Sequence, residues 1–334
     1  MPTQQRNEVF DGFKFLLIAL VAVGHFSESY RYSYTVVLGG YSVVYLFHMP
    51  LFILLSGYFS KHISLEKIGR TFVHTWQAYL LMALAAILLI THDWGNLYEP
   101  KSSYWYLLSL MEWKIMYFLL KKTVGKDGPI LGLSFALVPV GMLLVNRDVE
   151  VLSVMRTICF FPFFVIGTML SDAGLQKIRS HRLVLSVLTL LVFIAVYCLS
   201  SRYVHELLWH RRSAFQLSQE FGYTIGHVFW NTALIYIASL LVTISLLSVS
   251  KLPHWMSRYG KYSLTFYVLQ EISWDINKNF LGLPMPVQYA WCFLTLLLGI
   301  FLVEKNWQDW LVRPLTIGYS RFSHFCAVCL KSKR

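Results

Sequence analysis

Charged residues are scarce in this sequence. Only 14% of its 334 residues are Asp, Glu, Lys or Arg, whereas a soluble domain averages about 25%. Hydrophobic residues make up 56% of the chain, which excludes intrinsic disorder because disordered chains have low hydrophobicity. The small number of polar residues also argues against a soluble nucleic-acid-binding protein, although the formal net charge is +12. The composition therefore predicts an all-α polytopic membrane protein.

Several motifs of common enzyme classes are missing. The chain has no Gly-rich phosphate loop, no Gly-x-Ser-x-Gly, no internal repeat and no low-complexity tract. Its one Cys-x-x-Cys, Cys326 and Cys329, supplies only half of a zinc site. His205 and His210 diverge by about 100° on a helix, whereas the paired histidines of a zinc metalloprotease lie on one face. We predict no metal and interpret the histidine segment as a polar helix in an outer loop.

Ten apolar runs are long enough to cross a membrane, since a spanning helix needs about 20 mostly apolar residues. They predict a transmembrane domain over 1–304. A cytoplasmic tail at 305–334, with apolar residues alternating with charges, is expected to lie at the membrane interface. The predicted spans are 12–30, 38–58, 72–91, 103–120, 129–146, 152–172, 181–199, 226–249, 260–281 and 287–304.

The basic residues fall mostly on one side of these spans. With the N-terminus placed inside, the inner segments hold 20 basic and seven acidic residues, and the outer segments hold eight basic and nine acidic residues. Cytoplasmic loops of membrane proteins are enriched in Lys and Arg. The distribution therefore predicts that both termini are cytoplasmic, and it explains the positive net charge mainly as a topology signal.

The first span carries ionisable residues on one face. Lys14 and His25 lie about 20° apart around an α-helix and about 16 Å apart along it. Glu28 lies one turn beyond His25, where its carboxylate can orient the imidazole. Ionisable residues are costly inside a membrane and are therefore candidates for function. Two simpler explanations stay open: Lys14 extends to the membrane surface, and His25 hydrogen-bonds to a neighbouring helix.

Further polar residues lie in later spans. His48 lies in the second span just before Pro50, which is expected to kink that helix, and Ser56 and Gly57 near its end allow close backbone packing. Other candidates lie at the inner end of the third span and in the fourth, sixth and ninth spans. They are Lys67, Arg70, Trp105, Glu112, Arg156, Gln270 and Glu271. The charged residues among them are also compatible with plain ion pairing to other buried or interfacial charges.

Many of these residues form a pattern that begins with a basic residue followed, after ten residues, by a histidine. The matching pieces are Asp11, Lys14 and His25, then Phe47-His48-Met49-Pro50-Leu51-Phe52, Leu55-Ser56-Gly57-Tyr58, Lys67, Arg70, Trp105-Tyr106-Leu107, Phe161-Pro162-Phe163-Phe164-Val165-Ile166-Gly167 and Gly260-Lys261-Tyr262-Ser263-Leu264 with Tyr267. Over roughly 6–280 the chain resembles acyltransferase family 3, the bacterial integral membrane O-acyltransferases. Within that family it resembles the fucose 4-O-acetylase-like branch.

The resemblance implies about ten helices, a multi-pass location in the bacterial inner membrane and an acyl donor, usually acetyl-CoA, that enters from the cytoplasm. The implied acceptor is a carbohydrate hydroxyl on a surface or exported polysaccharide or its lipid-linked precursor. His25 matches the family's essential histidine and Lys14 its basic partner, whereas Gln270 stands where many members have a histidine. The implied partners are coenzyme A, the carbohydrate and the lipid bilayer, without nucleic acid; a homo-oligomer is compatible with the sequence.

The chemistry of acyl transfer gives these residues candidate roles. A neutral His25 is expected to accept the proton of the sugar hydroxyl, oriented by Glu28, while His48 or a backbone N–H near Pro50 stabilises the oxyanion. Direct transfer and a covalent acyl-His25 intermediate both stay open, as do transfer of a succinyl or other acyl group and a non-enzymatic role as a transporter or export partner. The donor-binding candidates are Lys14, Ser56, Lys67 and Arg70, and the acceptor-binding candidates are Trp105, Arg156, Gln270 and Glu271.

Overall fold

All regular structure in the described residues is helical. The computed structural model describes residues 7–88, 92, 94–97, 104–144 and 151–307, and it confirms the predicted all-α class. The helices are α1 (Glu8–Ser27), η1 (Glu28–Tyr30), α2 (Thr35–Tyr58), α3 (Leu65–Ala86), η3 (Trp94–Leu97), α4 (Trp105–Thr123), α5 (Asp127–Leu144), η5 (Val151–Ser153), α6 (Val154–Met169), α7 (Asp172–Ser180), α8 (Arg182–Cys198), α9 (Arg202–Trp209), α10 (Ala214–Phe221), α11 (Ile225–Leu246), α12 (His254–Gly260), α13 (Ser263–Ile276), η6 (Asn277–Leu281) and α14 (Met285–Glu304).

Each predicted span overlaps one of these helices, but the helices differ in length and polarity. Within the described residues, five helices are long and apolar enough to cross a membrane, namely α1 with η1, α2, α5, α11 and α14. A sixth span results if α6 and α7, which meet at an angle of 100°, count as one. The remaining long helices are shorter or more charged: α8 and α13 have 17 and 14 residues, and α3 and α4 carry Lys67 and Glu112. The tail from residue 308 onward, with Cys326 and Cys329, lies outside the described residues.

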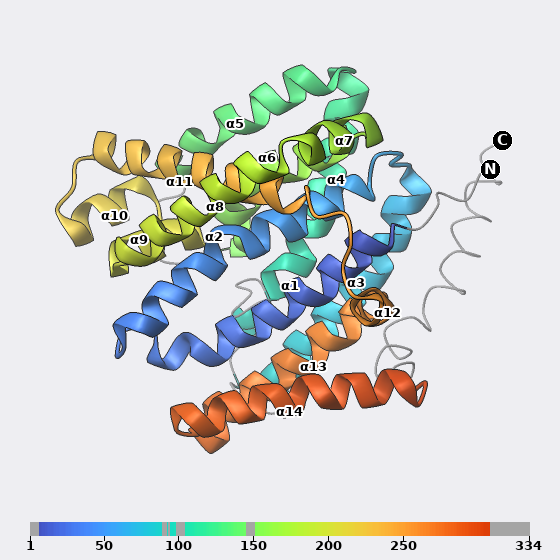
Figure 1. Ribbon diagram of the computed structural model, residues 1–334, viewed down its shortest axis with the longest axis vertical. Coiled ribbons are helices and arrows are strands. Elements are labelled where there is room, and N and C mark those ends of the chain that lie inside the picture. Colours follow the sequence, from blue (N-terminus) through green and yellow to red (C-terminus); the bar gives the residue numbers. More distant parts are fainter. Residues whose placement is uncertain (1–6, 89–91, 93, 98–103, 145–150, 308–334) are drawn as a thin grey trace.

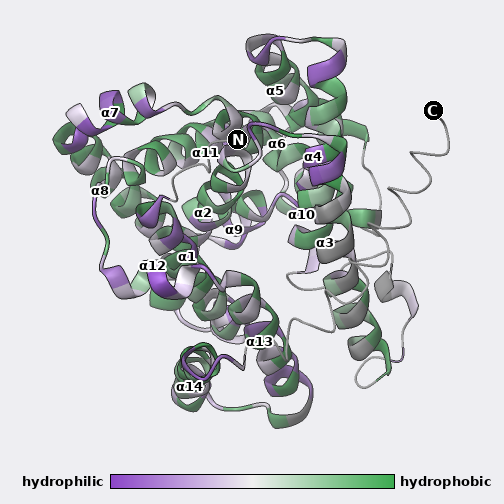
Figure 2. Ribbon diagram, turned by 90° about the vertical axis from the view of Figure 1, so that its right-hand side faces the viewer, coloured by the Kyte–Doolittle hydropathy of each residue, from purple (hydrophilic) through white to green (hydrophobic). Residues whose placement is uncertain are grey.

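The long helices pack side by side in a fixed order. Across one layer, α14 lies against α13, α13 against α1, α1 against α2, α2 against α6, and α6 against α5 (Figure 1). A second group, α8 and α11, packs on α2, and the short helices α9 and α10 connect α8 to α11 at one end of the molecule. The long helices are largely hydrophobic, whereas hydrophilic residues gather in α7 and α12 (Figure 2). This arrangement brings α1, α2, α6 and α9 around a common interior space.

Helices α2 and α6 touch backbone to backbone. A Cβ atom at Gly57 would lie 2.0 Å from the carbonyl oxygen of Phe164, and one at Gly167 would lie 1.9 Å from that of Leu54. Real Cβ atoms do not approach so closely, so both positions require glycine. The close approach predicted at the Ser56-Gly57 pair is therefore confirmed, and α2 runs through Pro50 without ending.

Candidate active site

A cavity of about 350 Å³ lies between the ends of α1, α2, α4, α6, α9 and α13. Its volume falls within the range of small-molecule sites, roughly 300–1,000 Å³. The cavity gathers five residues predicted from the sequence, two of them on α2 or α6 and the rest on α1, η1 and α4. They are His25, Glu28, His48, Trp105 and Arg156. The other lining residues are Ile18, Val21, Tyr45, Met49, Phe52, Tyr106, Phe160, Leu208, Trp209, Arg211, Tyr267 and Lys278.

His25 and Glu28 face each other where α1 ends. The α-helix stops at Ser27, and Glu28 begins a 3-10 turn that keeps its carboxylate on the same side as the imidazole. His25 Nδ1 lies 4.0 Å from Glu28 Oε2, and within the described part of the chain this buried nitrogen has no hydrogen-bond partner. The separation is longer than a hydrogen bond, as is common for catalytic pairs in the absence of substrate. The two groups therefore form a pair that a small movement would close.

His48 is fixed by its own helix. Its Nδ1 lies 2.9 Å from the carbonyl oxygen of Val44, and because a carbonyl only accepts, neutral His48 carries its proton on Nδ1. The other nitrogen, Nε2, is then an acceptor. Pro50 has no N–H and leaves the Leu46 carbonyl without its usual helical partner, but neither residue lines the cavity. From this part of α2, His48 therefore presents an acceptor to the cavity, its Nε2.

Aromatic rings form much of the cavity wall. Trp105 stacks on Phe160 with ring centroids 5.5 Å apart, and the guanidinium of Arg156 lies 4.7 Å above the Trp105 ring. The Tyr106 hydroxyl bonds to Ser56 Oγ at 2.8 Å. Ser56 Oγ donates to the carbonyl oxygen of Phe52, so Tyr106 is the donor in its bond with Ser56. Ser56 thus reaches the site through Tyr106 and does not line the cavity itself.

The basic residues expected to bind the donor lie elsewhere. Lys14 forms an ion pair with Asp11 at 3.1 Å and lies 4.0 Å over the ring of Phe59. Lys67 Nζ donates to the backbone carbonyl of His62 at 2.8 Å. Neither lysine lines the cavity, and the side chain of Arg70 is not among those described. The helical rise from Lys14 to His25 is about 16 Å, so Lys14 lies near the opposite end of α1.

Gln270 and Glu271 form a buried pair behind the cavity wall. Both side chains are inaccessible to solvent, and Gln270 Nε2 donates to Glu271 Oε2 at 3.0 Å. One turn further along α13, Asp275 accepts a hydrogen bond from the Tyr104 hydroxyl at 2.8 Å. Of this part of α13, only Tyr267 lines the cavity. The two predicted acceptor-binding residues therefore support the wall rather than face the open space.

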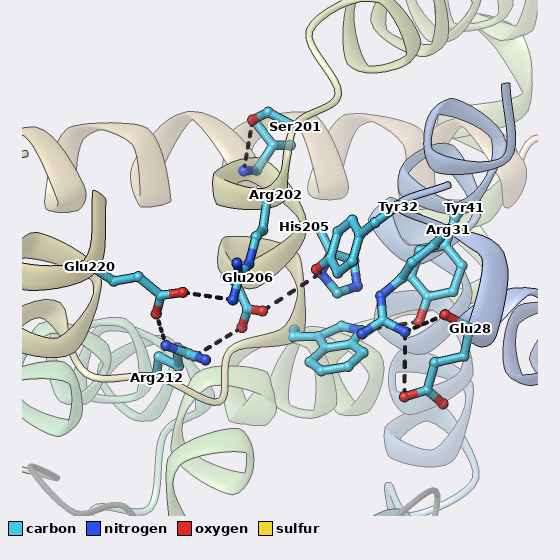
Figure 3. Close-up of polar contacts among 12 residues, drawn as sticks. Glu28, Arg31, Tyr32, Tyr41, Ser201, Arg202, His205, Glu206, Arg212 and Glu220 are labelled. Carbon is cyan, nitrogen blue, oxygen red and sulfur yellow. Dashed lines mark hydrogen bonds and ion pairs between the residues drawn. The ribbon is translucent and has the colours of Figure 1, made fainter. Parts of the chain in front are cut away.

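The segment from α9 to α10 covers the cavity from one side, and we call residues 201–222 the cap. The Tyr32 hydroxyl bonds to His205 Nδ1 at 2.7 Å (Figure 3), and Trp209 Nε1 donates to the Tyr41 hydroxyl at 3.3 Å. Within the cap, ion pairs join Arg212 to Glu206 at 3.1 Å and Arg202 to Glu220 at 3.0 Å, and a further pair joins Arg212 to Glu220 (Figure 3).

The cap corrects one sequence-based interpretation. The segment around His205 is helical, but it is not a polar, solvated helix, because the side chains of His205, Glu206, Leu207 and Leu208 are buried. Burial, together with the charges of Arg31 and Arg202, lowers the pKa of His205 to about 3. Burial alone lowers the pKa of His210 to about 4. Both histidines are therefore neutral when the cap is docked.

Sequence reasoning did not single out several lining residues, chiefly Tyr45, Trp209, Arg211 and Lys278. Arg211 and Lys278 entered only as charges on the outer side. In the structure, the guanidinium of Arg211 lies 5.8 Å from the Trp209 ring. A tryptophan and a basic residue two positions apart in the longest outer loop were the feature of the sequence that indicated this part of the site.

The family follows from comparison with known sequences. Residues 7–305 match the model of acyltransferase family 3, which describes an acyltransferase domain. Because the match covers most of the chain, the protein belongs to this family and is a membrane acyltransferase. No curated protein and no solved structure matches the chain. Among the described residues, no group of three or more His, Cys, Asp or Glu side chains is placed to hold a metal ion.

Proposed function

We propose that this protein is an O-acetyltransferase of the fucose 4-O-acetylase-like branch, located in the bacterial inner membrane. It transfers an acetyl group from acetyl-CoA to a hydroxyl of a surface or exported polysaccharide or its lipid-linked precursor. The observation that carries the proposal is the cavity in which His25, Glu28 and His48 meet a wall of aromatic rings. A proton acceptor beside flat apolar surfaces suits a sugar hydroxyl better than it suits an ion or a hydrophobic substrate.

The reaction needs a base for the sugar hydroxyl. In the proposed mechanism, the Glu28 carboxylate accepts a hydrogen bond from His25 Nδ1–H, so that the unprotonated Nε2 removes the proton of the attacking hydroxyl. The sugar oxygen bonds to the thioester carbonyl carbon, and the C–S bond then breaks. The thiolate of coenzyme A leaves and takes up the proton from His25. The guanidinium of Arg156, which lines the cavity, supplies N–H donors for the negative charge that develops on the carbonyl oxygen.

The donor is proposed to enter from the opposite end of α1. Lys14, Lys67 and Arg70 are basic residues at this end and suit the phosphates of coenzyme A. The pantetheine arm then covers the distance of about 16 Å between Lys14 and His25. This arrangement places both termini and the donor on the cytoplasmic side, whereas the cap and the acceptor lie on the other side. The proposed topology follows the charge distribution of the sequence.

The test is acetyl transfer by purified protein in proteoliposomes, with labelled acetyl-CoA and glycan from a candidate polysaccharide. The variant His25→Ala is expected to lose acetyl ester formation, while His62→Ala, which replaces an exposed histidine, keeps it. Retention of acetyl transfer by His25→Ala would contradict the assignment. In a second experiment, the protein is incubated with labelled acetyl-CoA in the absence of glycan. If the label becomes covalently attached to the protein, the reaction passes through an acyl-enzyme intermediate and direct transfer is excluded.

One observation supports a second donor. Arg156, Arg211 and Lys278 all line the cavity, and these cations suit the free carboxylate of a succinyl group. Competition between acetyl-CoA and succinyl-CoA in the same proteoliposomes distinguishes the two. If acetyl-CoA is the donor, Arg211→Gln and Lys278→Gln leave the ratio of the two products unchanged. If succinyl-CoA is the donor, both variants lower kcat/KM for succinyl-CoA relative to kcat/KM for acetyl-CoA.

A further inference from the structure

The Glu28 carboxylate lies between the imidazole of His25 and the guanidinium of Arg31. Its Oε2 is 4.0 Å from His25 Nδ1 and its Oε1 is 3.5 Å from Arg31 Nη1. Both His25 Nδ1 and Arg31 Nε are buried and, within the described residues, have no hydrogen-bond partner. The three residues follow one another at intervals of three, about one turn, so their side chains lie on one side of the chain where α1 ends and η1 begins. Figure 3 shows the contact of Glu28 with Arg31.

We propose that Arg31 is a positioning residue for the catalytic histidine and acts through Glu28. This inference rests on the proposed function of the His25 site. Arg31 Nη1 also donates to the backbone carbonyl of Glu28 at 2.6 Å, so the guanidinium contacts both the main chain and the side chain of this residue. A guanidinium forms paired, planar bonds with carboxylates. A shift of the carboxylate toward Arg31 Nε and His25 Nδ1 satisfies both unpaired nitrogens at once.

Arg31 is in turn held by the cap. Its guanidinium lies 4.7 Å from the ring of Tyr32 and 4.9 Å from the ring of Trp209. Trp209 belongs to α9 and lines the cavity, and Tyr32 bonds to His205 of the same helix. Contacts of a guanidinium with aromatic faces are attractive, because the ring face is negative and the guanidinium is positive. Through Arg31, the position of the cap is therefore linked to the orientation of His25.

The inference makes a specific kinetic claim. Arg31 contributes to catalysis only while residue 28 is a carboxylate, because it acts on the imidazole through that group. In a double-mutant cycle, Arg31→Gln is expected to lower kcat about tenfold or more in the native background and less than about twofold in the Glu28→Gln background. KM for the glycan and for acetyl-CoA is expected to change less than kcat, since Arg31 does not line the cavity.

Two further variants separate positioning from folding. Arg31→Lys keeps the charge but loses the planar pair of donors, and it is expected to recover only part of kcat. Arg258→Gln is the matched control: this arginine, outside the cap, also lies near a tyrosine ring, that of Tyr259 at 5.8 Å, but pairs with Glu304 instead of Glu28. It is expected to leave kcat unchanged. All variants are compared at equal amounts of monodisperse protein, as judged by size-exclusion chromatography.

The outcomes are distinct. An equal effect of Arg31→Gln in both backgrounds, or an equal loss with Arg258→Gln, would overturn the positioning role and leave the proposed function in place. Transfer activity that survives in His25→Ala would instead overturn the proposed function itself. A rise in KM for the glycan with unchanged kcat would make Arg31 a binding residue and would also overturn the inference.

Discussion

At the scale of single residues, the two cavity histidines differ in what their ring nitrogens contact. His25 faces a carboxylate at 4.0 Å, whereas His48 is bonded to the Val44 carbonyl at 2.9 Å. The first arrangement leaves the imidazole able to take up a proton and share the resulting charge with Glu28. The second fixes one tautomer and directs a lone pair into the cavity. His48 is thus suited to accept a hydrogen bond from the sugar or from a water molecule.

The acceptor role of His48 gives a prediction at this scale. Asparagine can replace Nδ1 of His48 but not Nε2, whereas the longer glutamine reaches the Nε2 position. His48→Asn is therefore expected to lower kcat by roughly 10²-fold, at the low end of general acid–base effects, and His48→Gln by less. The measurement is kcat for acetyl transfer in proteoliposomes. Equal activity of the two variants would argue against a role for Nε2.

The cavity residues that could be predicted from the sequence are those on the long helices. His25, Glu28, His48 and Arg156 were found from the sequence because each is an ionisable residue in or beside an apolar run, and Trp105 was found through the family resemblance. The structure brings all five to the cavity. Residues of the cap and of η6, such as Trp209, Arg211 and Lys278, could not be found in this way. Their positions depend on how a loop folds back over the helix ends, which a local pattern does not encode.

At the scale of elements, the contact between α2 and α6 depends on two glycines. Overpacking of a tight interface costs about 1–3 kcal/mol, and the clashing atoms at Gly57 and Gly167 are backbone carbonyls, which cannot rotate away. Gly57→Ala and Gly167→Ala are therefore expected to lower the thermal unfolding midpoint in detergent. Gly40→Ala, in the same helix as Gly57 but with no atom within 4 Å of the added Cβ, is expected to leave the midpoint unchanged. Equal shifts in all three variants would contradict the close contact.

The cap is expected to respond to pH. His205 and His210 have folded-state pKa values of about 3 and about 4, below the ordinary histidine value of about 6.5. Their neutral forms favour docking, so the docked cap is fully stable above pH about 6.5 and loses stability as the pH falls toward the folded-state values. Hydrogen exchange of residues 201–222 is expected to accelerate between pH 6.5 and 4.5 after correction for the intrinsic rate. In the variant His205→Gln, lowering the pH is expected to accelerate hydrogen exchange less than in the native protein. An equal acceleration in both proteins would show that His205 does not cause the pH dependence.

The elements also show where sequence patterns reach their limit. The apolar runs located the long helices, since period and length are local properties. The bend of 100° between α6 and α7 was not predicted; there the chain leaves the helix at Leu170, whose backbone is extended. The burial of α9 was not predicted either, because it depends on polar contacts with Tyr32, with Tyr41 of α2 and with Glu220 of α10, which a local pattern does not show.

At the scale of the whole molecule, the proposed topology separates two surfaces. The end of α4 near Lys122 is placed in the cytoplasm, and α10 with Gln219 on the other side. In a background without native cysteines, Gln219→Cys is expected to react with a membrane-impermeant maleimide in spheroplasts, whereas Lys122→Cys is expected to react only in inverted vesicles. Both side chains are exposed, so burial does not protect either one. Reaction of the two in the same preparation would contradict the positive-inside assignment.

The backbone contact of α2 with α6 also restricts how the molecule changes shape. Two helices that interlock without side chains between them resist sliding and rotation, because every displacement brings main-chain atoms together. Both helices carry cavity residues, His48 on α2 and Arg156 on α6. The part of the cavity wall that these two helices form is therefore expected to be rigid. We therefore expect any widening of the cavity to come from the cap and α13, which also line it, and not from a movement of α2 against α6.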